Sequence, residues 1–334
     1  MALPVRDGGA RFGAVLAALA GQTVAHELLV CDSGSRDGSP ELARRHGARV
    51  LEIPAAAFGH GRVRNLLMQE AGGEHVALLS QDAEPAAADW LEALLGGFAL
   101  APDVAIVYGP DRPRPDASTA VRIELERWFG SLAPEGRPTV QRLDPRERDL
   151  PAVQLVGARG FFTDANACVA RRAWREVPFR DVAYAEDRAL ALDMLRAGYA
   201  KAFVPAAAVL HSHDYTPVQE LRRGFDEWRG LLEVYGWREP ASPADIARRL
   251  RGELGAARRE AAIAGMSPRR RLQALAAVGG RSILRLTGAM LGSRADSLAP
   301  AARSMLSLEG RGSFVGAQDL ESPAPAAGTD DQTP

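Results

Sequence analysis

Short apolar runs alternate with longer amphipathic stretches through the first two thirds of the chain. Apolar runs of strand length occupy residues 27–31, 49–53 and 75–79. The stretches around them have helical spacing, and we expect helices over residues 10–20, from about residue 39, and over 61–71. Strands that alternate with helices are typical of a mostly parallel sheet covered on both faces. The pattern therefore predicts an α/β fold.

The pattern continues beyond residue 100 with less regularity. The Pro/Arg-rich stretch 109–118 is expected to lack regular structure. Only a few residues precede the turn at Asp7, so the first strand is unusually short, as expected of a truncated or misassigned start. Further elements are expected as strands at 104–108, within 160–170 and at 202–204, and as a helix at 187–197.

From residue 217 onward the pattern is helical. Residues 236–311 contain 14 arginines against six acidic residues, which makes this the strongly basic part of the chain. Residues 312–334 are rich in Gly, Ala, Pro and Asp, a composition typical of a disordered tail. We therefore expect three regions, which are an α/β domain over 1–216, an Arg-rich helical region over 217–311 and a tail over 312–334.

The composition fits a globular protein and argues against two other classes. The 334 residues are 46% hydrophobic, enough for one large α/β domain with an appendage. A formal net charge of -1 argues against a protein that holds nucleic acid through a broad positive field. No secretory leader pattern and no run of about 20 apolar residues is found. We expect a cytoplasmic protein, with peripheral membrane contact still open.

The two cysteines, Cys31 and Cys168, lie among apolar neighbours and lack the CxxC spacing of a zinc site. We expect both to be reduced core residues, and a single disulfide between them is the alternative.

Carboxylates follow two of the predicted strands. Asp32 directly follows the run at 27–31, in the small-residue stretch VCDSGSRDGS. A carboxylate at the carboxyl end of a parallel strand can accept hydrogen bonds from a nucleobase or ribose, and small residues let a ligand approach the backbone. We interpret Asp32 as ligand-binding and Asp37 as a turn and cap residue. Asp82 falls at the same sheet edge, where it could hold Mg²⁺ or Mn²⁺ between two phosphates; a plain turn is the alternative.

Glu186 and Asp187 open an amphipathic helix. The helix dipole favours acids in the first turn, which explains one of the two. The other is a candidate general base, which would have to lie within hydrogen-bond reach of an acceptor hydroxyl.

Histidines and a basic helix start provide two more candidate groups. His211 and His213 lie two residues apart after a strand, so both could face a metal, although one would suffice and either could be a surface residue. Arg64 and Asn65 lie near the start of the predicted helix 61–71. Arginines at a helix N-terminus suit a diphosphate, and a solvated basic helix face explains them equally well.

In this order, the stretches together resemble the inverting family 2 glycosyltransferases of the GT-A fold, and more narrowly their bacterial rhamnosyltransferase-like branch. The resemblance covers residues 3–216 and rests on LPVRDGG, LLVCDSGSRDGS, FGHGRVRNLLMQEA, ALLSQDAEPA, GFFTDANACVARRAWREVPF, YAEDRALALDMLRAGY and VPAAAVLHSHDYT. One such stretch is weak evidence, whereas seven in register are specific. The resemblance implies a single nucleotide-diphospho-sugar transferase domain with a mostly parallel central sheet, plus C-terminal helices.

On the donor side, the resemblance implies that Asp32 reads the nucleotide base and that Pro4, with the backbone after it, helps to hold the base. Arg64 and Asn65 match a family motif close to the donor, where Arg64 would neutralise the diphosphate or orient the sugar.

The resemblance also implies a metal site for Mg²⁺ or Mn²⁺. Asp82 matches the last acid of the family's DxD motif, whose first position here is Ser80. That departure leaves one carboxylate fewer on the ion, so water or a histidine is expected to complete its coordination. His211 matches the position where many members supply that histidine, and His213 is a second candidate.

For catalysis, Asp187 matches the family's base, and Glu186 would shape or support the site. Asp187 would remove the proton of the acceptor hydroxyl as that oxygen attacks the anomeric carbon. Asp164 and Asn166 lie in a segment, FTDANA, that resembles the acceptor side of the family site.

The predicted activity is transfer of rhamnose or another deoxyhexose from a nucleoside diphosphate, expected to be dTDP-rhamnose, to a hydroxyl of a cell-surface or lipid-linked glycan. Two alternatives stay open. A nucleotidyltransferase that makes nucleotide sugars would ordinarily have a Gly-rich, basic loop, of which LPVRDGGARF is a poor version. A catalytically silent nucleotide-sugar-binding scaffold is also compatible with Ser80 and the short first strand.

The Arg-rich region resembles the family less sharply. Arg281 and Arg285 interrupt the apolar face of one of its predicted helices. This pattern suits an interfacial helix attracted to anionic lipid, where an undecaprenyl-linked acceptor would lie. Packing against the α/β domain or a dimer partner is an alternative of at least equal weight.

Overall fold

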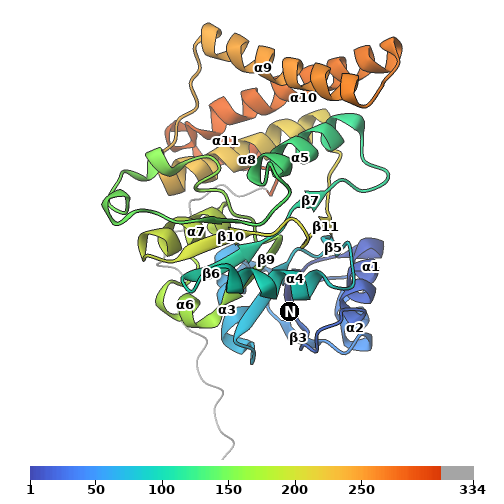
Figure 1. Ribbon diagram of the computed structural model, residues 1–334, viewed down its shortest axis with the longest axis vertical. Helices are drawn as coiled ribbons and strands as arrows, with labels where there is room; N and C mark the ends of the chain where they lie inside the picture. Colours follow the sequence, from blue (N-terminus) through green and yellow to red (C-terminus); the bar gives the residue numbers. More distant parts are fainter. Residues whose placement is uncertain (310–334) are drawn as a thin grey trace, which may run out of the picture.

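The computed structural model describes residues 1–309, and its centre is an eight-stranded sheet in the order β3-β2-β1-β4-β9-β6-β10-β8 (Figure 1). The strands are β1 (Ala2–Val5), β2 (Leu29–Asp32), β3 (Arg49–Glu52), β4 (His75–Leu79), β6 (Val104–Tyr108), β8 (Thr139–Gln141), β9 (Asn166–Ala170) and β10 (Ala200–Phe203). Most neighbours are parallel, whereas β9 runs antiparallel to β4 and β6, and β8 runs antiparallel to β10. The α/β prediction is therefore confirmed, and the predicted tail at 312–334 lies outside the described residues.

The predicted strands are found close to their expected positions. Strands β4 and β6 have the predicted bounds, whereas β2 begins two residues later than predicted and ends one residue later, so that Asp32 ends the strand. The element expected within 160–170 is a strand only from Asn166 onward. The first strand is short, as expected, and pairs along its whole length with β2.

A second, three-stranded sheet in the order β5-β11-β7 lies beside the carboxyl ends of the main strands. Its strands are β5 (Glu84–Pro85), β7 (Asp111–Arg112) and β11 (Val209–Leu210). The expectation that residues 109–118 lack regular structure is wrong at β7, because β7 pairs in parallel with β11. The pairing continues to His211, whose backbone N–H donates to the Arg112 carbonyl oxygen at 3.0 Å.

Helices cover both faces of the main sheet, as the alternating pattern predicts. Apolar residues of α3, α5, α6 and α7 pack on one face, and those of α1, α2 and α4 pack on the other. These helices are α1 (Gly9–Ala20), α2 (Ser39–Arg45), α3 (His60–Glu70), α4 (Trp90–Gly96), α5 (Thr119–Leu132), α6 (Arg171–Glu176) and α7 (Glu186–Arg196). Cys31 and Cys168 belong to these cores as free, buried thiols.

The C-terminal part of the described chain is helical, as predicted, and lies over the carboxyl-end side of the sheet (Figure 1). Its helices are α8 (Pro217–Tyr235), α9 (Pro243–Ile263), α10 (Pro268–Gly292) and α11 (Pro300–Leu306). Helix α10 packs closely on α8, because a Cβ on Gly288 would lie 2.2 Å from the Leu221 carbonyl oxygen. Helix α9 packs on α10 and lies furthest from the sheet. None of the helices in residues 1–309 has the length and apolar character needed to cross a bilayer.

Candidate functional site

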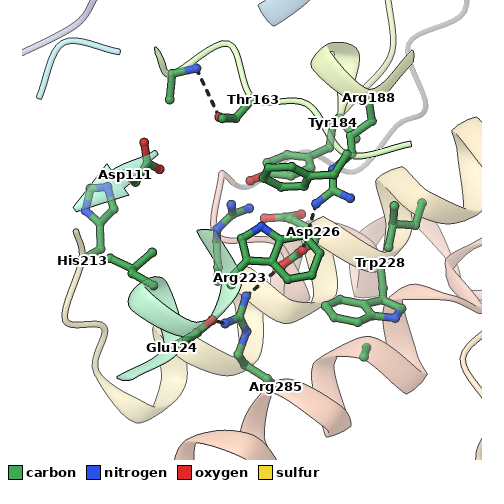
Figure 2. A pocket seen from close by; sticks show the side chains of 18 of the residues that line it. Asp111, Glu124, Thr163, Tyr184, Arg188, His213, Arg223, Asp226, Trp228 and Arg285 are labelled. Atoms are coloured by element: carbon green, nitrogen blue, oxygen red, sulfur yellow. Dashed lines mark hydrogen bonds and ion pairs between the residues drawn. The ribbon is translucent and has the colours of Figure 1, made fainter. Parts of the chain in front are cut away.

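A cavity of about 760 Å³ lies between the main sheet and the C-terminal helices. It is lined by residues that follow β4, β6 and β11, by the start of α7, and by one side of α5, α8 and α10 (Figure 2). The regions expected at 1–216 and 217–311 therefore meet at this cavity, and each supplies part of its wall.

Strand direction explains why acidic residues from distant parts of the sequence meet here. Strands β4 and β6 are parallel to each other, so Asp82 and Asp111, which follow them, emerge at the same sheet edge. Strand β9 runs the opposite way between them, so Asp164, which precedes it, also lies at that edge. All three line the cavity.

Asp82, His211 and His213 form a group that could hold a metal ion. One ligand atom from each lies within 4.8 Å of the others. The Asp82 oxygens are 3.5 Å from His211 Nε2 and 3.3 Å from His213 Nε2, and the two Nε2 atoms are 3.1 Å apart. The structure brings both predicted histidines together with the predicted acid. One carboxylate and two imidazoles would leave further coordination positions for ligand oxygens.

Asp111 supports this group and is the residue that the motifs do not identify. The Nδ1 N–H of His211 donates to Asp111 at 3.0 Å, so Nε2 is directed toward Asp82. A carboxylate behind a metal-binding imidazole fixes the ring and its tautomer. The available sequence signal is an aspartate after a strand, which is weak because Asp111 lies in the stretch expected to be irregular.

The charges within this group depend on one another. Although burial favours its neutral form, the hydrogen bond and charge of His211, with the charge of His213, hold the pKa of Asp82 below its usual range. Burial also opposes the charged form of His211, but Asp111 and Asp82 raise the pKa of this imidazole to about 10. A cation that binds Nε2 would therefore displace a proton from His211.

The second group of the site surrounds the start of α7. The Arg64 guanidinium is buried, forms a bidentate ion pair with Asp164, and lies 3.0 Å from Glu186. Arg64 also donates to the His60 carbonyl oxygen at 3.3 Å. The guanidinium is thus surrounded by protein acceptors, which differs from the expectation that it faces a diphosphate. In this structure it holds Glu186 and Asp164 together.

Asp187 is the carboxylate that Arg64 leaves free. It lines the cavity, is only partly exposed, and accepts a hydrogen bond from the Arg188 backbone N–H at 2.6 Å. Burial and the neighbouring Glu186 raise the pKa of Asp187 to about 6. A carboxylate with a pKa near neutrality, in a cavity, has the property required of a general base.

The local backbone fixes the direction of this pair. Ala185 precedes α7 with φ of 66°, in the left-handed region that non-glycine residues rarely adopt. Helix α8 packs against it through Gly230, where a Cβ would lie 2.8 Å from the Ala185 Cβ and 2.9 Å from the Tyr184 carbonyl oxygen. The C-terminal helices therefore take part in placing Glu186 and Asp187.

The two residues expected to hold the nucleotide base lie at the same sheet edge, outside the cavity lining. Asp32 is buried at the end of β2, and its carboxylate accepts hydrogen bonds from Gly34 N, Ser35 N and the Ser35 hydroxyl. Pro4, in the adjacent strand β1, pairs with Cys31 of β2. Their roles in base recognition stay predictions. Asp37 stabilises the turn as expected, because its carboxylate accepts hydrogen bonds from Ser39 and Gly9. The expected cap role is wrong, since Gly38 is the N-cap residue of α2.

Two predicted contact residues lie away from the cavity and have structural partners. The Asn65 side chain bonds the backbone of Phe179 and the indole of Trp174. Asn166 is fully buried, accepts from Trp90 and donates to the backbone of two loops. Both amides fix segments next to the site, and neither lines it.

Comparison with known proteins agrees with this geometry. Residues 3–149 match the family model described as glycosyl transferase family 2. The chain is 29% identical over 231 residues to the O-antigen chain rhamnosyltransferase RfbN of Salmonella typhimurium, covering 67% of this chain and 69% of that protein. It is also 29% identical over 205 residues to the O-antigen chain rhamnosyltransferase WbaN of Salmonella anatum, covering 60% and 61%.

A solved structure shares the fold across nearly the whole chain. The mannosyltransferase PcManGT from Pyrobaculum calidifontis, determined in complex with GDP-Man and Mn²⁺, superposes with a TM-score of 0.57 at 17% identity. The superposition covers 87% of this chain and 85% of that structure. At this identity, the similarity is evidence for the fold.

Proposed function

We propose that this chain is a family 2 glycosyltransferase that transfers rhamnose or another deoxyhexose from a nucleoside diphosphate to a hydroxyl of a cell-surface or lipid-linked glycan, with inversion. The observation that carries the proposal is the presence of two groups in one cavity: the Asp82, His211 and His213 cluster, and the free carboxylate of Asp187. The similarity to two O-antigen rhamnosyltransferases supports the choice of sugar and acceptor.

The proposed reaction assigns a separate task to each group. Asp187 takes the proton of the acceptor hydroxyl while that oxygen bonds to the anomeric carbon and the bond to the diphosphate breaks. Asp82, His211 and His213 would hold Mn²⁺ or Mg²⁺, which supplies charge stabilisation for the leaving nucleoside diphosphate. The imidazole ligands favour Mn²⁺ over Mg²⁺. Glu186, paired with Arg64, keeps the start of α7 in place.

The donor is tested by binding. We expect dTDP with Mn²⁺ to raise the apparent unfolding temperature more than UDP or GDP does, because a ligand that binds only the folded state stabilises it. Thermal unfolding of the full chain with each nucleotide, with and without Mn²⁺, measures this. A larger shift with UDP or GDP would change the assigned base. A preference for a nucleoside triphosphate, with release of pyrophosphate, would support the nucleotidyltransferase alternative, and no binding at all would support the silent scaffold.

For a lipid-linked acceptor, we propose a membrane-facing surface that differs from the one expected. Arg281 and Arg285 pair with Glu124 and Glu220 on the cavity side, so the packing alternative holds for that face. We propose instead that the turn between α9 and α10, at the upper right of Figure 1, contacts the cytoplasmic face of a membrane. This turn exposes two apolar side chains, Ile263 (80% exposed) and Leu272 (70% exposed). They lie among exposed arginines that form no ion pair with any described residue, which are Arg258, Arg259, Arg269 and Arg270.

Vesicle binding tests this surface. The double change Ile263→Asp and Leu272→Asp is expected to reduce co-sedimentation with phosphatidylglycerol vesicles at least fivefold, because it removes inserted apolar area and adds negative charge. Met305→Asp, at an exposed position on α11, is the control and is expected to bind as the unmodified chain does. Equal sedimentation of the double variant and the control would contradict the proposed surface.

A further inference from the structure

One arginine on the cavity wall has no acidic partner within residues 1–309. Acidic side chains outnumber arginines among the residues that line the cavity. The other arginines there each lie within ion-pair distance of a carboxylate. Arg223 of α8 makes neither an ion pair nor a hydrogen bond with any residue in 1–309, and its Nη1 atom is buried. A buried donor without an acceptor is costly in folding free energy, and a ligand oxygen would offset that cost.

Arg223 contacts the segment that leads into α7 and lines the same cavity as Glu186 and Asp187. Its guanidinium carbon is 4.9 Å from the centre of the Tyr184 ring, and Tyr184 lies two residues before Glu186. Figure 2 shows the Arg223 side chain rising from α8 toward this ring. Contact with an aromatic face orients the guanidinium while its N–H groups stay available for a ligand.

The acid one helical turn beyond Arg223 already has other partners. Glu227 lies 3.0 Å from Arg285 and 3.5 Å from Arg188. With these arginines and Arg223 nearby, the pKa of Glu227 falls to about 2 although burial opposes this. Two cations therefore pair with Glu227 directly, and the charge of Arg223 remains available to the cavity.

We propose that Arg223 binds phosphate oxygens of a substrate in this cavity. The proposal rests on the function proposed above, which requires a diphosphate close to Asp187. A guanidinium can donate two parallel hydrogen bonds to phosphate oxygens. Its positive charge would also offset the repulsion that the acidic walls exert on such a group. The phosphate can come from the nucleoside diphosphate of the donor or from a phosphate that links the acceptor glycan to a lipid.

Binding measurements on the full chain distinguish the two sources. The variants are Arg223→Gln, Arg223→Lys and a control, Arg222→Gln, whose side chain lies on a separate shallow groove with Pro217 and Val218. One set of calorimetric titrations uses dTDP, UDP and GDP with Mn²⁺, and the other uses farnesyl diphosphate as a soluble polyprenyl diphosphate. We expect Arg223→Gln to weaken one class of probe at least tenfold, Arg223→Lys to recover part of the loss, and Arg222→Gln to bind as the unmodified chain does.

Each result leads to a different conclusion. Weaker nucleotide binding assigns Arg223 to the donor diphosphate, and weaker binding of farnesyl diphosphate alone assigns it to the acceptor phosphate. Unmodified protein that binds no nucleotide, but binds farnesyl diphosphate through Arg223, would overturn the proposed donor and support Arg223 as a phosphate ligand. Unchanged binding of both classes by folded Arg223→Gln would overturn the proposal, as would unmodified protein that binds neither class.

Discussion

Replacing Asp187 by asparagine is expected to lower kcat by about 10²- to 10⁴-fold, because the amide cannot take the proton of the acceptor hydroxyl. The change preserves the size and shape of the side chain, so nucleotide binding in the presence of Mn²⁺ should stay within about twofold of the unmodified chain. Steady-state transfer to the acceptor measures the first quantity, and calorimetric titration measures the second.

The pH dependence of the same reaction gives a second measurement of this residue. Burial and Glu186 raise the pKa of Asp187 to about 6, so lowering the pH through this value protonates the carboxylate and removes the base. With Mn²⁺ saturating at each pH, we expect kcat/KM to fall about tenfold per pH unit well below pH 6 and to reach a plateau above it. The control is Asp193→Asn, on the outer side of the same helix, which should keep the profile. A flat profile from pH 5 to 7 would contradict the role of Asp187.

Removing the divalent ion with a chelator is expected to abolish transfer, and Mn²⁺ is expected to restore it. The sharper test is Asp111→Asn, which leaves all three predicted ligands in place and weakens the carboxylate that orients His211. Loss of such a supporting carboxylate typically costs about 10- to 100-fold in metal affinity. Titration of activity with Mn²⁺ should therefore show a shifted midpoint and a similar maximum.

The control for Asp111→Asn lies five residues away in the same segment. Asp116 is exposed, and among residues 1–309 its one ion pair is with Arg11, at 4.0 Å, so Asp116→Asn should leave the Mn²⁺ midpoint unchanged. Equal midpoints for both variants would show that Asp111 does not support a metal ligand. Because Asp82 and Asp111 raise the pKa of His211 to about 10, Mn²⁺ must displace a proton, and its affinity should rise with pH up to about that value.

The order of strands, helices and acidic residues could be predicted from the sequence because each depends on local spacing. Asp82, Asp187, His211 and His213 each follow or begin a recognisable element, and the cavity or its metal group contains all four. Asp111 could not be predicted in the same way. Its position depends on pairing between β7 and β11, which lie about a hundred residues apart.

The spacing of residues in the sequence also cannot distinguish a residue that contacts a ligand from a residue that only holds such a side chain in place. Arg64 and Asn65 are adjacent in a motif, yet Arg64 binds Asp164 and Glu186, whereas Asn65 holds the backbone at Phe179. The partners of Arg64 are about a hundred residues away, and the antiparallel direction of β9 decides that Asp164 reaches it. Only the folded chain shows that Arg64 pairs with Asp164 and Glu186.

The contact between Gly230 and Ala185 has a consequence for how acceptor specificity can evolve in this protein. A left-handed alanine costs roughly 1 kcal/mol, so the surrounding packing must hold it in place. Helix α8 lines the cavity and packs against Ala185. A mutation that shifts the α8 backbone to admit a larger glycan would therefore also displace Asp187, the proposed base. We therefore expect new acceptor specificities to arise through side-chain substitutions on α8 that leave its backbone in place.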